Sequence, residues 1–417
     1  MSDDLMNEIA AAKDKSSIIM VVGVGGAGGN AVNHMWNLGI KDVGFMVCNT
    51  DAQALDNSPV EEKVQLGREG LGAGNDPENG RKAAIESLDD IRRRLEAAGT
   101  RMLFVTAGMG GGTGTGASPV IAKLAHEMGI LTVGIVTSPL AVEGKIRYEQ
   151  AFRGIEELSR NVDSLLVINN ENIVEMYGRL SLKQAFGKAD DILASAAKGI
   201  AEIITVESDM VNVDFADVSK VMRDSGRAHM SVATAEGEHR AAEVARASLE
   251  SPLLDHTLIS GAKNILLNIS TSDADSLALD EVMEILKYIQ SHASVQAPDG
   301  TVHDANIIWG TSVKPQLGRR IELVVVATGF DSAAIERAAK PVVPPADVLA
   351  AQPREENTVL EPIKPRPVPT LRPMTQVMLG ERPTRYKNIE AQLAVPAYRT
   401  RKAELIVETS TSRKEVL

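Results

Sequence analysis

The feature that most constrains the fold is a glycine-rich run in the first third of the chain, Gly110-Gly111-Gly112-Thr113-Gly114-Thr115-Gly116. An apolar segment, Met102 to Ala107, precedes the run, and a helix-compatible segment, Ala117 to Met128, follows it. Glycines adopt positive φ angles and let backbone N–H groups approach an anion, and the N-terminus of the next helix attracts the same charge. The order of strand, glycine loop and helix therefore predicts a phosphate-binding loop, to which Thr113 and Thr115 add hydroxyl donors.

Two other interpretations of this run are a flexible linker and a close-packing turn. A linker is disfavoured, because linkers do not usually lie between a buried strand and an amphipathic helix. The run also lacks the Lys-Ser/Thr pair of the P-loop pattern. Charge compensation for bound phosphates is therefore expected from backbone amides and a bound magnesium ion.

Strand-like and helix-like segments alternate through the first half of the chain. The other strand-like segments there are Ser17 to Gly23, Val43 to Asn49, Thr132 to Thr137 and Ser164 to Asn169. Alternation of this kind predicts an α/β fold with a mainly parallel sheet, helices on both faces and ligands at the carboxyl ends of the strands.

A long helix-compatible segment, Ser181 to Thr205, leads to a second region, Asn212 to Phe330. In that region Ile265 to Ser270 and Ile321 to Thr328 are strand-like, and Leu277 to Ile289 is helix-like. We expect a smaller mixed α/β domain there. At 417 residues the chain is long enough for two domains, and its 44% apolar and 24% charged content is ordinary for a globular protein.

Composition also excludes several classes of function. No apolar run reaches membrane-spanning length and the start of the chain is acidic, so we expect a cytosolic protein without direct membrane insertion. The single cysteine, Cys48, excludes an intramolecular disulfide, and the seven scattered histidines show no ligand spacing. The net charge of −12 argues against nucleic acid as the main partner.

The last 87 residues differ from the rest. From Asp331 onward there are 14 lysines and arginines against 11 acidic residues, so this segment carries +3 and the first 330 residues carry −15 of the total −12. It also holds 11 of the 18 prolines and only one glycine, Gly380. Such a composition predicts a disordered linker. An apolar island, Leu393 to Arg399, is either a short peptide that docks on a partner or a bystander.

A second glycine loop, Gly23 to Asn30, matches G-x-G-x-x-G after a strand. Alone it fits a dinucleotide-binding fold, with Asp51 at the end of the next strand placed to hold a ribose. An NAD-dependent oxidoreductase is therefore the enzyme alternative. The loop at Gly110 disfavours it, because two anion-binding loops at one sheet edge fit a nucleoside triphosphate better.

Five motifs occur together and in order: the two glycine loops, Asn49 to Leu55, Gly70 to Gly74, and Asn212 to Val218. Together they closely resemble the FtsZ family, the bacterial cell-division GTPases related to tubulin, over roughly residues 16 to 330. The resemblance implies a flexible N-terminus (1–15), a Rossmann-type GTP-binding domain (16–180), a central helix (181–205), a C-terminal activation domain (206–330) and a linker with a terminal interaction peptide (331–417).

The resemblance also assigns nucleotide contacts. It implies that Gly25, Gly26 and the loop from Gly110 to Gly116 wrap the phosphates, that Ala73 and Gly74 sense the γ-phosphate, and that Asp51, Glu143 and Arg147 lie at the same site. Glu143 and Arg147 also fit a plain helix-surface salt bridge, because they are four residues apart.

For the base, the resemblance implies that Phe186 stacks and that Asp190 and Asn30 meet the guanine edge. Guanine presents two adjacent N–H donors that one carboxylate can accept together, whereas adenine has no such pair. Phe186 and Asp190 are four residues apart and would share a helix face. A core phenylalanine and a solvated aspartate fit the same spacing.

Catalysis would fall to Asn212, Asp214 and Asp217. If the preceding helix crosses the molecule, its about 25 residues span roughly 40 Å, so these groups cannot reach their own subunit's nucleotide. The resemblance implies that they reach the next subunit's nucleotide in a head-to-tail filament, where GTP is hydrolysed with Mg2+. A structural role for Asp217, which it could fill in addition, is to cap a helix from Val218 to Arg223, whereas Asp214 has no equally good structural role.

The implied partners are further copies of the chain and, through the C-terminal peptide, membrane-anchoring and regulatory division proteins at a mid-cell ring. Leu140 and Val142 stand where the family often has phenylalanine, which alters packing but leaves Glu143 in place. A third hypothesis is a nucleotide-binding structural protein that assembles without hydrolysing GTP.

Overall fold

A computed structural model describes residues 17–330, except for 41, 178–181, 206–210, 212, 251–258 and 297–301, and two short strands near the end of the chain. Two units divide the chain, 1–342 and 343–417. In the second unit, the described residues form an antiparallel pair, β13 (Ile406–Glu408) and β14 (Lys414–Val416). The apolar island at 393–399 lies outside the described residues.

The first unit is built on one ten-stranded sheet with the order β11-β8-β12-β7-β6-β5-β4-β1-β2-β3. Its strands are β1 (Ile19–Val24), β2 (Gly44–Asn49), β3 (Glu62–Gln65), β4 (Met102–Gly108), β5 (Leu131–Ser138), β6 (Ser164–Asn169), β7 (Gly226–Ala235), β8 (Asn264–Thr271), β11 (Asn306–Val313) and β12 (Ile321–Thr328). All neighbours from β3 to β7 are parallel, and β12 is antiparallel to both β7 and β8. A separate antiparallel pair joins β9 (Val295–Gln296) to β10 (Val302–His303).

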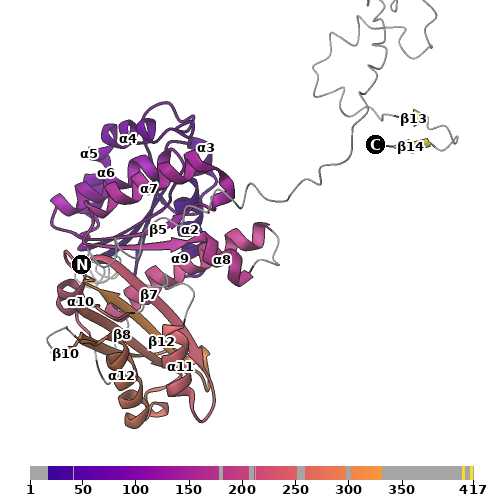
Figure 1. The fold of residues 1–417 in the computed structure, drawn as a ribbon. Coiled ribbons are helices and arrows are strands. Elements are labelled where there is room, and N and C mark those ends of the chain that lie inside the picture. Colours follow the sequence, from indigo (N-terminus) through magenta and orange to yellow (C-terminus); the bar gives the residue numbers. More distant parts are fainter. Residues whose placement is uncertain are drawn as a thin grey trace, which may run out of the picture. The chain divides into compact units, whose positions relative to one another are not determined.

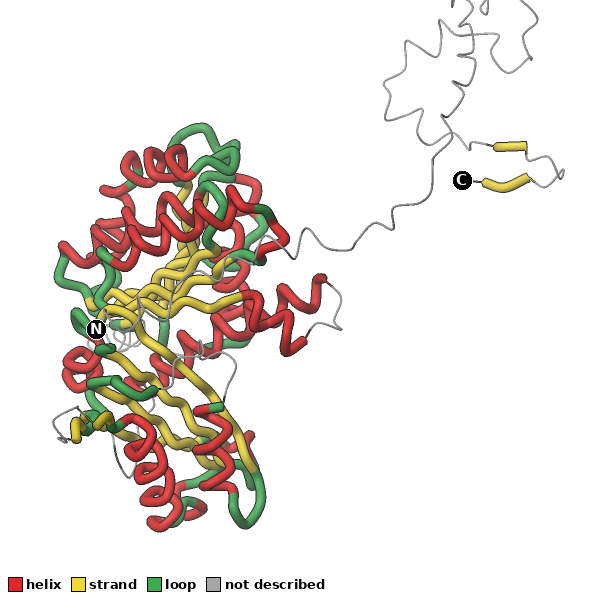
Figure 2. Tube along the Cα trace, viewed as in Figure 1, coloured by secondary structure: helices red, strands yellow, loops and turns green. Residues whose placement is uncertain are grey.

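Helices cover both faces of this sheet (Figure 2). They are α2 (Gly25–Asn37), α3 (Ala52–Asp56), α4 (Pro77–Glu86), α5 (Leu88–Ala97), α6 (Thr113–Glu127), α7 (Lys145–Ser159), α8 (Asn170–Tyr177), α9 (Leu182–Thr205), α10 (Phe215–Met222), α11 (Arg240–Leu249) and α12 (Leu279–Ala293). Short 3-10 turns occur at η1 (Ala141–Glu143), η2 (Ala274–Ser276) and η3 (Pro315–Leu317). Figure 1 shows α4 to α7 together on one side and α9 on the other.

The strands are apolar on both sides because both faces are covered. Along β1, Ile19 and Val21 belong to one core, whereas Met20 and Val22 belong to the opposite core. The first core packs α2, α9 and α10 against the sheet, and the second packs α5, α6 and α7. A third core lies between α11, α12 and the strands β8 and β12.

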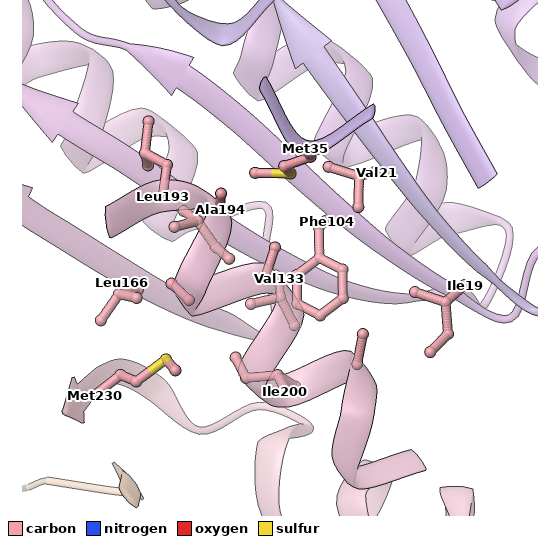
Figure 3. Packing of buried hydrophobic residues seen from close by; sticks show 14 of the residues in the cluster. Ile19, Val21, Met35, Phe104, Val133, Leu166, Leu193, Ala194, Ile200 and Met230 are labelled. Carbon is pink, nitrogen blue, oxygen red and sulfur yellow. The ribbon is translucent and has the colours of Figure 1, made fainter. Parts of the chain in front are cut away.

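Helix α9 packs along the sheet across the junction between its two halves. Figure 3 shows Ile200 of α9 near Phe104 of β4 and Val133 of β5, with Met230 of β7 to the left of Ile200. The approach is close at Gly199, where a Cβ atom would lie 2.7 Å from the Met230 methyl carbon. One helix therefore packs on strands from both halves of the sheet.

Each strand-like segment named from the sequence is a strand, and Ser181 to Thr205 corresponds to α9. The helix expected at Leu277 to Ile289 runs from Leu279 to Ala293. The sequence did not identify β3, β7 or β11, nor the parallel pairing of β6 with β7 that makes the sheet continuous. The domain boundaries stay predictions.

Candidate functional site

Four connections that carry the predicted nucleotide contacts meet at the carboxyl edge of the parallel strands. β1 runs into α2 at Gly25, β2 runs into the turn at Asp51, β4 runs into the loop before Thr113, and β5 runs into η1. Since β2, β1, β4 and β5 are adjacent and parallel, the four turns lie side by side. In open α/β sheets this edge is where ligands bind.

The two glycine loops touch each other. Gly25 has a φ of +73°, and a Cβ atom there would lie 2.8 Å from the Gly114 nitrogen and 3.2 Å from the Thr113 Cβ. A Cβ on Gly114 would lie 2.6 Å from the Gly108 carbonyl oxygen. By contrast, Gly26 and Gly111 face open space, with no atom within 4 Å of the Cβ position. The loops therefore support each other and leave backbone open on one side.

Other glycines of the run pack against neighbouring segments. A Cβ on Gly112 would lie 2.8 Å from the Ala73 Cβ, and a Cβ on Gly116 would overlap the Pro77 carbonyl oxygen. Gly110 has a φ of +101°, and a Cβ there would lie 2.9 Å from the Cγ of Arg147. The run therefore works partly as the close-packing turn that the sequence also allowed.

The two threonines of the run have different environments. The Thr115 hydroxyl oxygen accepts a hydrogen bond from the Gly110 N–H at 2.8 Å, and the side chain is buried. Thr115 thus closes the loop on itself. The Thr113 hydroxyl lies 2.7 Å from the hydroxyl of Thr50, in the turn after β2.

The segment Gly70 to Gly74 lies against this turn. Its Leu71 forms an isolated antiparallel bridge with Asp51. Ala73 is buried against Gly112, whereas Gly74 is exposed and has a φ of +61°. The Asp51 carboxylate accepts hydrogen bonds from Gln53 N (2.9 Å) and Ala54 N (3.2 Å), so Asp51 caps α3.

Glu143 and Arg147 also reach the glycine loop. The Arg147 Nε lies 3.1 Å from a Glu143 carboxylate oxygen, and the other oxygen accepts a hydrogen bond from Leu140 N at 2.9 Å. Because Arg147 packs on Gly110, the ion pair lies beside the loop. The pair is both the helix-surface salt bridge that the spacing allowed and a neighbour of the predicted phosphate site.

The predicted base contacts lie where α2 meets α9. A cleft of about 260 Å³ lies there, and it is lined by His34, Gln184, Gly187, Lys188, Asp190 and Asp191. Asn30 is exposed one turn before His34 on α2. Phe186 belongs to α9, but its side chain lies outside the described part of the structure. Asp190 and Asn30 therefore come from the two helices that meet at this cleft.

The electrostatics of this cleft single out Asp190. Burial raises the pKa of the Asp190 carboxyl to about 6, with His34 opposing the rise and Asp191 adding to it. His34 Nε2 lies 2.8 Å from one carboxylate oxygen of Asp191, and the other carboxylate oxygen of Asp191 lies 2.8 Å from Lys188 Nζ. At neutral pH the Asp190 carboxyl is therefore ionised and can accept hydrogen bonds, although its burial makes the ionised form energetically unfavourable. The sequence interpretation missed His34, although its four-residue spacing from Asn30 could have identified it.

The predicted catalytic acids lie at the opposite edge of the sheet. Asp214 immediately precedes α10, whose first residue, Phe215, lies under the Arg101 guanidinium at 4.7 Å. Arg101 immediately precedes β4, which is seven residues long, and the glycine loop begins just after β4. At about 3.3 Å per residue, the strand separates the two by roughly 23 Å. In Figure 1, α10 lies at the left of the sheet and α3 at the right.

The expected capping roles of the two acids were wrong. Asp214, not Asp217, is the N-cap of α10, because its carboxylate accepts a hydrogen bond from the Asp217 N–H at 2.8 Å. Helix α10 begins at Phe215 rather than Val218, so Asp217 lies within its first turn. Asp214 is exposed and Asp217 is half-buried. Asn212 lies outside the described residues.

In the described residues, no group of three or more histidine, cysteine, aspartate or glutamate side chains is arranged so that it could hold a metal ion. A Mg2+ ion usually keeps several waters and takes other ligands from substrate phosphates, so it does not need such a group. The Thr50 and Thr113 hydroxyls, 2.7 Å apart at the end of the glycine loop, are oxygen atoms of the kind that Mg2+ takes as ligands. Within the residues that the structure describes, no helix has both the length and the apolar composition needed to span a membrane.

Two family models match the chain. The Tubulin/FtsZ family GTPase domain matches residues 18–178, and the FtsZ family C-terminal domain matches residues 226–331. The chain is similar to the cell division protein FtsZ of Porphyromonas gingivalis, with 46% identity over 334 residues that cover 79% of this chain and 71% of that protein. These matches favour a GTPase over the NAD-dependent oxidoreductase.

Solved structures agree. An FtsZ dimer from M. jannaschii aligns with a TM-score of 0.68 and 36% identity, covering 79% of this chain and 93% of that one. A CetZ1 monomer from Haloferax volcanii aligns with a TM-score of 0.63 and 20% identity, covering 77% and 99% of the two chains. The second likeness concerns the fold alone.

Proposed function

The chain belongs to the FtsZ family of tubulin-like cell-division GTPases, and we propose that it polymerises head to tail and hydrolyses GTP at a site shared by two subunits. In this proposal the carboxyl edge of the sheet binds the nucleotide, and the edge that carries Asp214 and Asp217 completes the neighbouring subunit's site. The filaments would form the division ring at mid-cell.

The observation that carries the proposal is the distance between the glycine loop and the acids. Strand β4 alone separates Arg101, beside α10, from the loop by roughly 23 Å. Hydrolysis needs a general base or water-orienting group within hydrogen-bond reach of the reacting atoms. Asp214 and Asp217 therefore cannot serve the nucleotide of their own subunit, whereas a second copy stacked on the carboxyl edge would bring its own acids there.

Such a contact joins two different faces of the same chain. Because a heterologous contact of this kind leaves one face of each end subunit free, repeating the contact produces an open filament. The M. jannaschii relative was solved as a dimer, which supports self-association in the family. GTP would lie between subunits, and its hydrolysis would weaken the contact.

The chain's own residues supply distinct parts of the proposed chemistry. Open backbone at Gly26 and Gly111 binds phosphate oxygens, and the neighbour's Asp214 and Asp217 orient the attacking water. When bound, Mg2+ would offset the charge of the phosphates, and the Thr50 and Thr113 hydroxyls would be available to it as oxygen ligands. Asp190 accepts the paired N–H donors of guanine and so excludes adenine.

Mixing two inactive variants tests the shared site. Gly111→Asp places a carboxylate in open space on the loop, where it repels phosphate without meeting neighbouring atoms. Asp217→Asn leaves the loop intact and removes an acid. In an equal mixture, half of the subunits have an intact loop and the other half have both acids. Random assembly therefore joins an intact loop to intact acids at a quarter of the interfaces, so the mixture should recover about a quarter of wild-type GTPase activity. A mixture no more active than its components would refute the shared site.

The matched variant at Asp214 separates capping from charge. Asparagine caps helices about as well as aspartate, so Asp214→Asn should retain the stability of α10 and GTP binding but lose at least tenfold in GTPase activity. Asp214→Ala additionally loses about 1 kcal/mol of stability.

The GTPase activity of the wild type, expressed per subunit, should rise as the protein concentration crosses the assembly threshold. A rate that stays flat would refute hydrolysis at the interface.

Contacts of the C-terminal peptide with membrane-anchoring and regulatory proteins belong to the same proposal. Residues 393–399 lie outside the described structure, so support comes from composition alone. Deleting 393–417 should leave assembly and GTP hydrolysis unchanged in solution while abolishing ring formation in cells.

A further inference from the structure

An open cavity lies between α10 and the turns that precede β4 and β5, at the edge of the sheet opposite the phosphate loop. We propose that the chain's own residues 1–16 dock in this cavity, and that a neighbouring copy must displace them to reach α10. Docking itself does not depend on the proposed function. Its effect on assembly rests on the proposed function, because it assumes that this edge contacts the next subunit.

Positive charge and apolar surface meet in this cavity, which has a volume of about 720 Å³. The described residues that line it include no acid and three cations, Arg101, Lys220 and Arg223. Its apolar side chains are Met128, Ile130 and Phe215. Because the first 330 residues carry a net charge of −15, this gathering of cations is unusual in the chain. It favours an acidic occupant that also has apolar side chains.

The three cations are available to such an occupant. All of them are exposed, and no ion pair joins Arg101 or Lys220 to an acid of the described residues. Arg223 has a long contact, 4.0 Å, with the buried carboxylate of Asp163. The acids at the start of α10 do not line the cavity. The charge of the cations is therefore largely uncompensated by the rest of the fold.

The chain enters the described structure at the rim of this cavity. The Ile18 carbonyl oxygen accepts hydrogen bonds from Arg101 N at 2.8 Å and from Met102 N at 3.0 Å. The Arg101 guanidinium lies 4.7 Å from the centre of the Phe215 ring of α10. Residues 1–16 are thus tethered next to the cavity, and a short tether gives an effective concentration of the order of millimolar.

The sequence of residues 1–16, which lie outside the described residues, has the required chemistry. Its charged residues are four acids, Asp3, Asp4, Glu8 and Asp14, and two lysines, Lys13 and Lys15, so its side chains carry a net charge of −2. Apolar residues stand among the acids at Leu5, Met6 and Ile9. Docking of this segment differs from the flexible N-terminus (1–15) that the resemblance implies.

The acids of the segment can reach the far wall of the cavity. Ten residues separate Glu8 from Ile18, and they span roughly 15 Å as a helix or 33 Å when extended. Lys220 lies five residues along α10 from Phe215, which is roughly 7.5 Å of helix. The tether is therefore long enough for Glu8 to meet Lys220.

Docking there places the segment beside the proposed catalytic acids. Asp214 is the N-cap of α10, and the next residue, Phe215, lines the cavity. In the proposed filament the same edge meets the neighbour's nucleotide, so the segment and the neighbour compete for it. A segment that is docked part of the time weakens the contact in proportion to the fraction of subunits that it leaves free.

Lys220 serves as the reporter for docking. A carbodiimide joins a carboxylate and an ammonium group in contact through an amide bond, and mass spectrometry identifies the linked peptides. The full-length protein is treated with GDP present, below the assembly threshold. We expect links from Lys220 to Asp3, Asp4 or Glu8. Lys82 is exposed on α4, beside the phosphate loop, and should form no link to these acids.

Isotope mixing separates the chain's own segment from that of a second copy. In an equal mixture of 15N-labelled and unlabelled protein, docking within one chain gives only links whose two peptides carry the same label. Links with mixed labels in statistical proportion, or the absence of links at Lys220, would overturn the proposal.

Neutral variants of the cavity test the role of charge while keeping the reporter. Arg101→Gln combined with Arg223→Gln should slow link formation about fourfold, because each exposed charge contributes about threefold to docking and the docked fraction falls from about two-thirds to about one-fifth. The matched control is Arg68→Gln combined with Arg92→Gln, two exposed arginines outside the cavity, which should retain the wild-type rate. Equal rates in the two double variants would overturn the proposal.

Neutralising the segment tests its effect on assembly. Asp3→Asn, Asp4→Asn and Glu8→Gln together should lower the protein concentration at which GTP induces light scattering by about threefold, since a docked fraction of about two-thirds leaves about one-third of the subunits competent. The control neutralises three exposed acids elsewhere and changes the net charge equally, through Glu61→Gln, Asp89→Asn and Glu96→Gln. It should keep the wild-type threshold, and an equal fall in both would refute the competition.

The two measurements separate this inference from the proposed function. Links at Lys220 need neither GTP nor filaments. Links within one chain in a protein that never assembles would refute the proposed function and leave docking intact. Absence of these links in a protein that assembles and hydrolyses GTP at the interface would refute docking alone.

Discussion

Replacement of Asp190 by asparagine should stabilise the nucleotide-free protein and weaken GTP binding at the same time. Burial raises the pKa of Asp190 from 3.8 to about 6, so the folded protein holds an ionised carboxylate at a cost at neutral pH. Its side chain makes no hydrogen bond to another described residue. Asparagine has nearly the same shape and no charge, so it removes that cost.

The size of the effect follows from the pKa. The difference between 3.8 and about 6 corresponds to about 3 kcal/mol at 1.36 kcal/mol per pKa unit. Because Asp190 is only half-buried, solvent screening reduces this to about 1 to 1.5 kcal/mol. The folded state binds the proton more tightly, so the contribution of Asp190 to the wild-type free energy of unfolding should fall as pH rises from about 4 to 6. The variant should lack that fall.

Nucleotide binding should change in the opposite direction. An amide offers one acceptor and one donor where the carboxylate offers two acceptors, so GTP should bind at least tenfold more weakly. Xanthine carries a carbonyl oxygen where guanine carries the 2-amino group, so xanthosine triphosphate should bind Asp190→Asn better than it binds the wild type. Urea unfolding at several pH values and competition with a fluorescent nucleotide measure both effects.

The neighbouring residue provides the control. Asp191 contacts His34 and Lys188, so Asp191→Asn removes the ion pair with Lys188 and alters the contact with His34, and it should not stabilise the nucleotide-free protein. If Asp190→Asn destabilises the nucleotide-free protein, its carboxylate has a favourable partner. If GTP affinity is unchanged, Asp190 does not read the base.

Gly114→Ala should lower GTP affinity more than tenfold, because its Cβ would lie 2.6 Å from the Gly108 carbonyl oxygen and force the loop to move. Gly111 has a negative φ and faces open space, so Gly111→Ala should leave the fold of the loop unchanged. An unfolding free energy equal to that of the wild type, measured without nucleotide, would verify this. Lys314→Met should cost about 3 kcal/mol of stability, because Lys314 is buried and the change removes the ammonium group that contacts the carboxylates of Glu202 and Glu322. Lys145→Met, which removes the exposed pair with Glu149, should change the unfolding free energy by less than about 0.5 kcal/mol, and an equal loss in both would contradict the argument from burial.

The parallel half of the fold could be predicted because its strands are short, apolar and separated by helical patterns. β7 could not, since its residues His229, Ser231 and Thr234 interrupt the apolar pattern in a strand that is paired on both sides. β3 is only four residues long and mostly polar, at the edge of the sheet. Periodicity identifies strands by burial, so it misses those whose side chains are polar or whose length is small.

The same difference appears at the candidate site. Sequence motifs located the glycine loops because glycine has a conformational meaning that does not depend on distant residues. They assigned helix capping to Asp217 rather than Asp214, because the start of α10 depends on packing of Phe215 that the local pattern does not contain. The contacts of His34 with Asp191 and of Thr50 with Thr113 could not be predicted, because the partners are more than 60 residues apart in the sequence.

Glycine is required in the central run for two separate reasons, and only one of them concerns a ligand. At Gly111 a side chain would meet no protein atom, so a requirement for glycine there would have to come from a bound phosphate. At Gly116 a side chain would overlap Pro77 of α4 even in the empty protein, so its requirement comes from helix packing. Gly111→Ala and Gly116→Ala should therefore differ in kind, the first losing nucleotide affinity at unchanged stability and the second losing stability without nucleotide. If Gly116→Ala were as stable as the wild type, α4 would be free to move away from α6, and the close packing would not be what holds the phosphate loop in place.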